Sequence, residues 1–173
     1  MQVSFPGLVT LLFAASLLAP QQASEPGDIH RVLLVDANQT FQMSDNVASS
    51  KSSWQVVISK QFYTFPGPRA ALRTKTTLPE FQFDKDPAFD DPVYLFRFDR
   101  HSDRREIRVA KSSGGLTEMS IPKDHLIETR MEEIGDGQNS TRRYRLRPLT
   151  PLPPGEYCLS RKLSICYDFG VDQ

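Results

Sequence analysis

The chain contains three histidines, His30, His101 and His125, and imidazole is a common general base and metal ligand. They lie tens of residues apart, and no two have the i,i+2 or i,i+4 spacing with which one strand or helix holds a metal. A G-x-S-x-G nucleophile elbow does not accompany them. Residues distant in sequence can still converge in space, as catalytic triads do. One hypothesis is therefore a metal-dependent or His/Asp hydrolase that uses His101, His125 and aspartates, and the alternative is surface or turn histidines.

The segment 84–91 contains four carboxylates, Asp84, Asp86, Asp90 and Asp91. Calcium prefers several oxygen ligands from a flexible loop, so these residues are candidate calcium ligands. Their spacing does not match the EF-hand pattern, and Lys85 sits among them. The alternative is a solvated turn between strands.

Arginine is concentrated in two segments, 141–147 and 97–111. Alternate residues of a strand share a face, so the first segment projects three guanidinium groups from one face, and the second has six basic and three acidic residues. Guanidinium forks suit phosphate, sulfate and carboxylate groups. If the two segments are neighbours in one sheet, they predict an anion-binding face for a polysaccharide, lipid headgroup or acidic protein. The alternative is a solvated face whose arginines pair with acidic residues across strands. The candidate residues are Arg143, Arg145, Arg147, Arg104 and Arg108.

The only two cysteines are Cys158 and Cys166. If the residues around them pair as a hairpin about Lys162, the two cysteines lie directly opposite each other, which predicts a disulfide in an oxidising compartment. Closing so short a loop would contribute roughly 2–3 kcal/mol. Two reduced, buried thiols are the alternative.

These residues lie in a chain whose apolar side chains alternate with the period of two that is typical of strands. The clearest hairpin joins 93–100 to 104–111, and apolar residues on both faces of 93–98 predict a central strand. Turns are indicated at 65–68, 114–115 and 135–137. Seven to nine mostly antiparallel strands separated by such turns predict an all-β fold of the β-sandwich type. The expected strands are 31–37, 54–64, 71–77, 80–84, 93–100, 104–111, 142–147, 156–161 and 163–169. The segment 125–134 fits either a strand or a helix, and we favour a strand.

The stretch LTPLPPGEYCL at 149–159 is similar to the L-x-P-G-x-Y motif of immunoglobulin-like, fibronectin type III-like and transthyretin-like modules. This resemblance implies an immunoglobulin-like β-sandwich in which the Tyr157 hydroxyl bonds back to the chain after a Pro-Gly turn. The chain also resembles small exported bacterial proteins that end in a GEY…DFGVD pair of strands. Neither resemblance implies an activity, since such sandwiches host many roles.

Residues 1–23 carry no charged side chain, and their apolar core at 8–18 has the length of a signal-peptide h-region. A spanning helix needs roughly 20 apolar residues, and this run stops at Pro20. The pattern predicts a signal peptide cleaved after Ala23, a flexible leader at 24–30 and one domain at 31–173. An uncleaved anchor or a buried helix is the alternative. Asn38 and Asn139 match the N-glycosylation acceptor pattern.

The 21 basic and 21 acidic residues give a net charge of zero, so attraction to nucleic acid is not built into the overall charge. A second long apolar run is not present, so we expect no membrane span in the mature chain. The leading hypothesis is a secreted or periplasmic, non-catalytic β-sandwich without a cofactor. It would bind an envelope protein, an anionic glycan or another envelope component. A structural or assembly module of the cell envelope is an alternative, as is the hydrolase described above.

Overall fold

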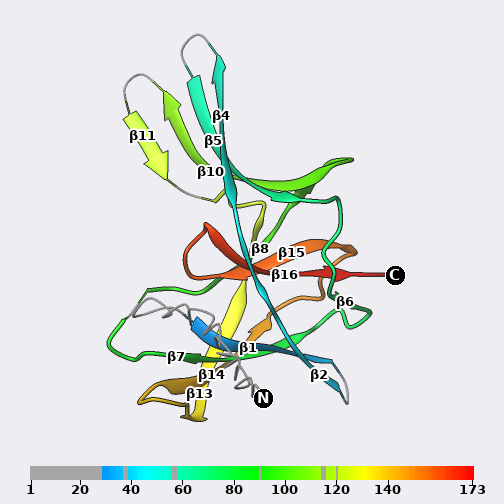
Figure 1. Cartoon of the computed structure of the whole chain (residues 1–173), viewed down its shortest axis with the longest axis vertical. Helices are drawn as coiled ribbons and strands as arrows, with labels where there is room; N and C mark the ends of the chain where they lie inside the picture. Colours follow the sequence, from blue (N-terminus) through cyan, green and yellow to red (C-terminus); the bar gives the residue numbers. More distant parts are fainter. Residues whose placement is uncertain (1–28, 37–38, 56–57, 90, 114–115, 120) are drawn as a thin grey trace, which may run out of the picture.

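The computed structural model describes residues 29–36, 39–55, 58–89, 91–113, 116–119 and 121–173 (Figure 1). The predicted signal peptide, most of the leader, Asn38 and Asp90 lie outside these residues. Within the described ranges the chain forms sixteen strands and no helix, which confirms the all-β prediction. It follows that none of these residues belongs to a helix with the length and hydrophobicity needed to cross a membrane.

Three sheets form the fold, and we call them A, B and C. Every pairing is antiparallel except that of β6 with β16. Sheet A has the order β13 (Thr129–Asp136), β14 (Arg142–Pro148), β7 (Glu80–Lys85), β1 (Ile29–Asp36) and β2 (Gln39–Gln42). Sheet B has the order β12 (Leu126–Ile127), β8 (Tyr94–Arg97), β15 (Gly155–Ser160), β16 (Ile165–Val171) and β3 (Asp45–Val47), with β6 (Arg73–Thr74) beside β16. Sheet C has the order β11 (Leu116–Met119), β10 (Arg104–Ser113), β5 (Ile58–Pro66) and β4 (Ser49–Gln55), with β9 (Asp99–Arg100) beside β10.

Sheet B is the middle layer of a face-to-face stack, with sheet A on one side and sheet C on the other (Figure 1). Neighbouring residues of β15 therefore enter different cores. Tyr157 packs into the core toward sheet A, and Cys158 packs into the core toward sheet C. On β8, Leu95 joins the first core and Phe96 the second. This double burial explains the apolar residues on both faces of 93–98 and confirms a central strand there.

The expected hairpin between 93–100 and 104–111 is wrong in its first half. β8 pairs with β12 and β15, and only β9 pairs with β10. The chain changes sheets at Phe98, which is 4% exposed and packs against the rings of Phe65 and Phe96 at 5.2 and 5.4 Å. Alternation shows which residues share a face, but it does not show which sheet a strand joins.

The single strand expected at 54–64 is also wrong. Trp54 lies near the end of β4 and pairs with Ser59 of the antiparallel strand β5. The stretch 54–64 is therefore divided between the two strands of one hairpin. The run WQVVIS contains neither Gly nor Pro to signal the reversal. The region 39–53, for which we predicted no strand, supplies β2, β3 and most of β4.

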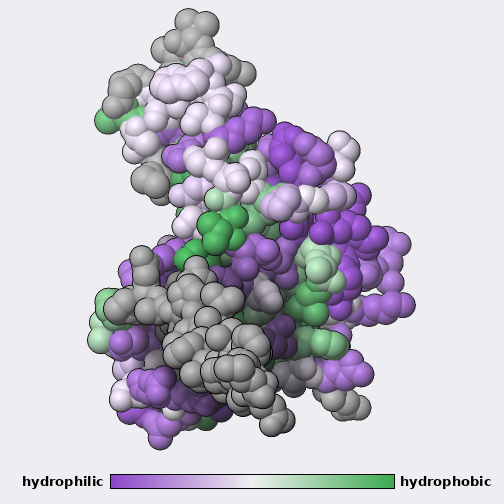
Figure 2. All heavy atoms as spheres, viewed as in Figure 1, coloured by the Kyte–Doolittle hydropathy of each residue, from purple (hydrophilic) through white to green (hydrophobic). Residues whose placement is uncertain are grey.

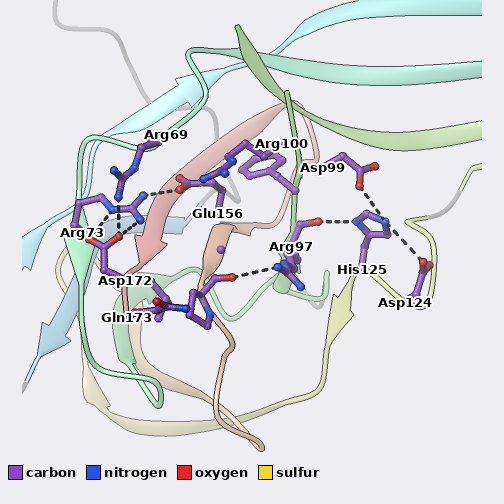
Figure 3. A pocket seen from close by; sticks show the side chains of 14 residues that line it. Arg69, Arg73, Arg97, Asp99, Arg100, Asp124, His125, Glu156, Asp172 and Gln173 are labelled. Carbon is purple, nitrogen blue, oxygen red and sulfur yellow. Dashed lines mark hydrogen bonds and ion pairs between the residues drawn. The ribbon is translucent and has the colours of Figure 1, made fainter. Parts of the chain in front are cut away.

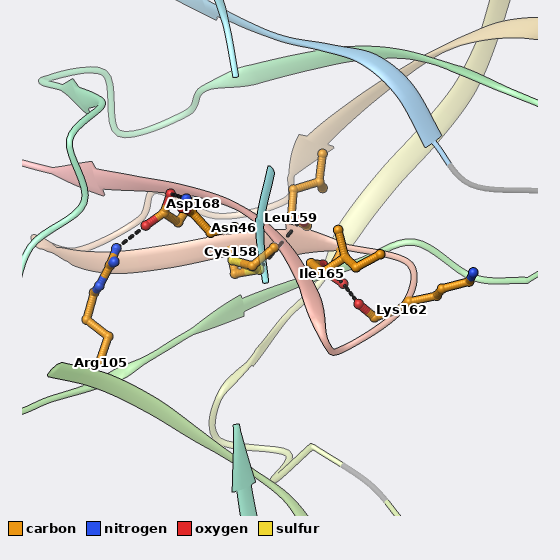
Figure 4. The surroundings of a disulfide bond; sticks show 9 residues. Asn46, Arg105, Cys158, Leu159, Lys162, Ile165 and Asp168 are labelled. Carbon is orange, nitrogen blue, oxygen red and sulfur yellow. Dashed lines mark hydrogen bonds and ion pairs between the residues drawn. A yellow bond between two sulfur atoms is a disulfide. The ribbon is translucent and has the colours of Figure 1, made fainter. Parts of the chain in front are cut away.

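Cys158 and Cys166 form the predicted disulfide, buried between sheets B and C (Figure 4). They are not directly opposite each other, because the register pairs Cys158 with Asp168 and the hairpin turns about Leu163. Cys166 lies two residues from Asp168, on the same face, so the bond joins diagonal neighbours whose Cα atoms are 5.6 Å apart. The turn is closed by a hydrogen bond from the Ile165 amide to the Lys162 carbonyl at 2.7 Å.

The hydrogen bond predicted for Tyr157 is present. Its hydroxyl donates to the carbonyl of Pro153 at 2.5 Å, and its ring is fully buried. Burial raises the pKa of Tyr157, although the positive charge of Arg97 opposes this effect. The tyrosine thereby fixes the turn that leads into β15.

A buried ion pair ties sheet C to sheet B (Figure 4). Arg105 of β10, with a side chain that is 5% exposed, donates to Asp168 of β16, and Asn46 donates to the other carboxylate oxygen at 2.7 Å. The remaining guanidinium donors reach the carbonyls of Pro66 and Gly67 at 3.1 and 3.2 Å. Both buried charges therefore have partners, as burial requires.

Candidate anion-binding site

A cavity of about 710 Å³ opens where β8, β9 and β15 meet the residues that follow β16 (Figure 3). Its lining is strongly charged. Strongly hydrophilic residues also gather on the side of the molecule where β16 ends, whereas the top of sheet C is paler (Figure 2). The charged residues that line the cavity are Arg69, Arg73, Arg97, Arg100, Asp99, Asp124, Glu156, Asp172 and His125.

Two of these arginines are already neutralised. Arg73 donates to Glu156 at 2.6 Å and to Asp172 at 2.5 Å, and Arg69 donates to Asp172 at 2.7 Å. Glu156 has a side chain that is 1% exposed, and it also accepts from the Ala70 amide at 2.7 Å. The hydrogen bond between Arg73 and Asp172 raises the pKa of Arg73 and lowers that of Asp172. This half of the cavity is a structural ion-pair cluster.

Glycine makes room for the Arg73 guanidinium. The guanidinium lies directly over Gly170, and a Cβ added to this glycine would come 1.7 Å from Nη1 of Arg73. A side chain at this position would require the Arg73 guanidinium to move. The glycine in β16 therefore marks a close approach of a side chain to the backbone.

The other two arginines have no carboxylate partner among the described residues. Arg97 donates to the Pro154 carbonyl at 3.1 Å, and its Nε would lie 2.9 Å from a Cβ added at Gly155. Arg100 lines the same cavity from β9, and both arginines are exposed. Figure 3 shows Arg97 between the Arg73 cluster and His125. Two guanidinium groups thus keep free donors at this site.

His125 contacts the backbone of Arg97 and lies near two aspartates. Its Nδ1 is 2.8 Å from the Arg97 carbonyl, and its Nε2 is 3.8 Å from carboxylate oxygens of both Asp99 and Asp124. The structure therefore brings one predicted catalytic histidine together with two aspartates. His101 does not line this cavity, and its Nε2 lies 3.0 Å from Glu106.

The three arginines predicted on one strand do lie together on β14, but each has an acidic partner on β7. Arg143 donates to Asp84 and Arg145 to Glu80, both at 2.9 Å, and Arg147 also pairs with Glu80. Burial would raise the pKa of Glu80, but hydrogen bonds from Gln82 and Arg147 and the two arginine charges lower it overall. This face of sheet A is a ladder of ion pairs, as the alternative reading of the sequence predicted.

The second arginine segment lies in a different sheet. β14 belongs to sheet A and β10 to sheet C, so the expected face shared by both segments is absent. Arg104 pairs with Glu106 at 2.9 Å and with Asp103 at 3.0 Å. Arg108 has no ion pair with the residues that the structure describes, and it lines a second cavity.

The structure describes three of the four candidate calcium ligands, and each of the three has a different interaction. Asp84 is buried against Arg143, Asp91 pairs with Arg161, and Asp86 accepts from the Ala88 amide at 2.8 Å. Asp90 lies outside the described residues. Within those residues no three His, Cys, Asp or Glu side chains are grouped to hold a metal ion. The calcium site stays a prediction.

The sequence analysis did not identify Arg97 and Arg100 as a pair. Both were counted only in the local charge of 97–111, because the strand boundaries there were wrong. The useful signals were glycines: Gly155 and Gly170 sit in otherwise regular strands, and such glycines often mark a close approach to the backbone.

Comparisons of the chain with protein-family models, with curated proteins and with solved structures found no match. The immunoglobulin-like resemblance stays a prediction.

Proposed function

We propose that this chain is an exported, non-catalytic binding protein whose cavity receives an anionic group of an extracellular or envelope component. The observation that carries this proposal is the contrast within one cavity. Arg69 and Arg73 are neutralised by carboxylates, whereas Arg97 and Arg100 are not. Guanidinium groups bind carboxylate, sulfate and phosphate through paired, charge-assisted hydrogen bonds.

The backbone that carries Arg97 is held in place before any ligand arrives. Arg97 ends β8, where it pairs with Tyr157 of β15, and its carbonyl contacts His125 at 2.8 Å. Its guanidinium donates to Pro154. A side chain that is already ordered loses less entropy on binding, which favours affinity.

The other side of the cavity suits hydroxyl groups. Asp99 and Asp124 are strong acceptors next to His125, so a ligand with an acidic group and neighbouring hydroxyls would satisfy both halves. Acidic sugars have this combination. An anionic glycan is therefore the partner class that the cavity fits best.

Export is supported by the uncharged apolar segment at 8–18 and by the disulfide, since such bonds persist in oxidising compartments. We place the protein outside the cytoplasm, secreted or periplasmic. The Tyr157 hydrogen bond supports an immunoglobulin-like sandwich as the framework.

The test is calorimetric titration of the 24–173 chain with a sulfated, uronate-containing heparin disaccharide. Arg97→Gln/Arg100→Gln should weaken binding about tenfold or more, because two charge-assisted contacts are removed. The matched control is Arg130→Gln/Lys75→Gln, which removes two exposed cations that lie outside the cavity and should leave binding unchanged. Equal binding by the wild type and the cavity variant would overturn the proposal.

The hydrolase hypothesis has one observation in its favour, the approach of His125 to Asp99 and Asp124. Among the described residues that line the cavity none is Ser, Thr or Cys, so the nucleophile would be a water activated by His125 or one of the lining carboxylates. Hydrolysis of glycoside, ester or phosphodiester substrates by the wild type, abolished in His125→Gln, would favour this second candidate over pure binding.

A further inference from the structure

A second cavity, of about 170 Å³, adjoins the first. The two share Asp99, Asp124 and His125 in their linings. The second is also lined by Lys60, Phe62 and Arg108 of sheet C. The arginine cavity therefore continues, past His125, onto one face of sheet C.

Four cations share that face of sheet C, and we call them the basic stripe: Lys51, Lys60, Arg108 and Lys111. Lys60 and Phe62 are two residues apart on β5, so their side chains point to the same side of the sheet. The register pairs Lys60 with Lys111, and it pairs Phe62 with Arg108 on one side and Lys51 on the other.

The basic stripe differs from the arginines of β14 in its charge balance. None of its four members forms an ion pair with a described residue, whereas Arg143, Arg145 and Arg147 all do. Lys60 and Lys111 are directly opposite, and like charges in that position destabilise a sheet. The register also pairs Lys111 with Glu118 of β11, so this row contains two lysines and one glutamate. An anionic ligand would relieve this repulsion.

We propose that the ligand is an acidic glycan chain that enters the cavity at Arg97 and Arg100, passes His125 and continues along the basic stripe. This inference rests on the proposed function and adds the length and path of the ligand. Rows two residues apart on a strand are separated by about 7 Å, so the row of Lys60 and the row of Lys51 would meet successive charges of a polymer.

The chemistry of the stripe favours a glycan over a nucleic acid. Ser53 lies beside Lys60 in the register and Ser113 lies on the same face as Lys111, so hydroxyl groups that can bond to sugars adjoin the cations. Single-stranded nucleic acids need exposed aromatic rings on which bases stack. The aromatic residue of these rows, Phe62, is partly buried.

The experiment uses size-defined heparin oligosaccharides, from disaccharide to decasaccharide, titrated into the 24–173 chain. Three variants are compared: Lys60→Gln/Lys111→Gln in the stripe, Arg97→Gln/Arg100→Gln in the cavity, and the Arg130→Gln/Lys75→Gln control. We expect the stripe variant to weaken decasaccharide binding about tenfold and to leave disaccharide binding unchanged. The cavity variant should weaken both ligands, and affinity should rise with chain length only in proteins with an intact stripe.

The outcomes separate the two proposals. Decasaccharide binding that depends on the cavity but not on the stripe would overturn the extended path and leave the proposed function standing. Binding that depends on the stripe alone, or on neither pair, would overturn both. An oligonucleotide of matched charge that binds as tightly as the decasaccharide would overturn the choice of a glycan.

Discussion

Arg73 and Arg97 line the same cavity, but only Arg73 has carboxylate partners among the described residues, and Glu156 is the buried one of its two. This carboxylate is buried beside Arg73, and burial of a charge is tolerated only when it has partners. Its two partners are the Arg73 guanidinium and the Ala70 amide. We therefore assign Arg73 to stability, which leaves Arg97 for the binding role proposed above.

The substitution Arg73→Met should lower the free energy of unfolding by about 3 kcal/mol, because it leaves the buried Glu156 carboxylate without its cation. The double variant Arg73→Met/Glu156→Gln should lose less, since the charge is removed together with its partner. Urea unfolding of the single and double variants measures both values. As a control, Arg142→Met breaks an exposed pair with Asp136 and should cost less than about 1 kcal/mol. A loss as small as the control's in Arg73→Met would contradict the assignment.

At the scale of elements, the hairpin of β15 and β16 forms the centre of the fold. Each strand is buried on both faces, so their side chains belong to two cores at once. The disulfide lies on the face toward sheet C, next to the pair of Arg105 and Asp168 (Figure 4). It holds together the element on which both outer sheets pack.

Replacing both cysteines, as Cys158→Ala/Cys166→Ala, should lower the free energy of unfolding by about 2.5 kcal/mol through the entropy of the closed loop. For a chain of this size the melting temperature should fall by about 5–10 °C. Differential scanning calorimetry measures the change. Mild reductant should have no effect on the native wild type, because both sulfurs are fully buried. Rapid reduction of the native protein would show that the hairpin opens.

The elements that the sequence predicted well are those with a simple alternating pattern. Residues 142–147 and 80–84 match β14 and β7 closely, because one face of each packs on the core. The strand partners were predicted poorly. The chain changes sheets at Phe98, which lies within an apolar run and so gave no signal of the change. The last hairpin is centred on Leu163 and not on Lys162. Alternation within a strand reports burial, whereas pairing depends on contacts between residues distant in sequence.

The candidate site was predicted less well than the fold for the same reason. The arginines of β14 were recognised, but their neutralisation by Glu80 and Asp84 depends on the pairing of β14 with β7. The cavity is lined by residues of β8, β9 and β15 and by the residues after β16, and no local sequence pattern shows that these segments lie together. The local signals of the cavity in the sequence were Gly155 and Gly170.

At the scale of the whole molecule, two carboxylates in different layers stabilise the fold only when ionised. The pKa of Glu80 in sheet A and that of Asp172 after β16 are both below their ordinary values of 4.5 and 3.8. A lowered folded-state pKa means that the stabilisation is complete above the ordinary value and is lost as the pH falls through the folded-state value. We therefore expect acidification to weaken the fold at two separated sites.

We expect the free energy of unfolding to be constant above about pH 5 and to decrease steadily below it. Glu80→Gln should remove part of this dependence, so the stability gap between variant and wild type should narrow as the pH falls. Urea midpoints between pH 6 and pH 3 measure the gap. Glu128→Gln, an exposed residue without an ion pair to the described chain, is the control and should follow the wild type. A gap for Glu80→Gln that stays constant with pH would contradict the sign.

The position of β15 and β16 also bears on when the protein can fold. These strands follow all other described strands in the sequence, yet they lie between the two outer sheets (Figure 1). Neither outer sheet can bury its apolar face until they arrive, so a partly synthesised chain has no complete core to close around. We expect such a chain to remain incompletely folded until its last strands emerge. If the protein is exported as proposed, that delay would keep the chain threadable through a narrow translocation channel.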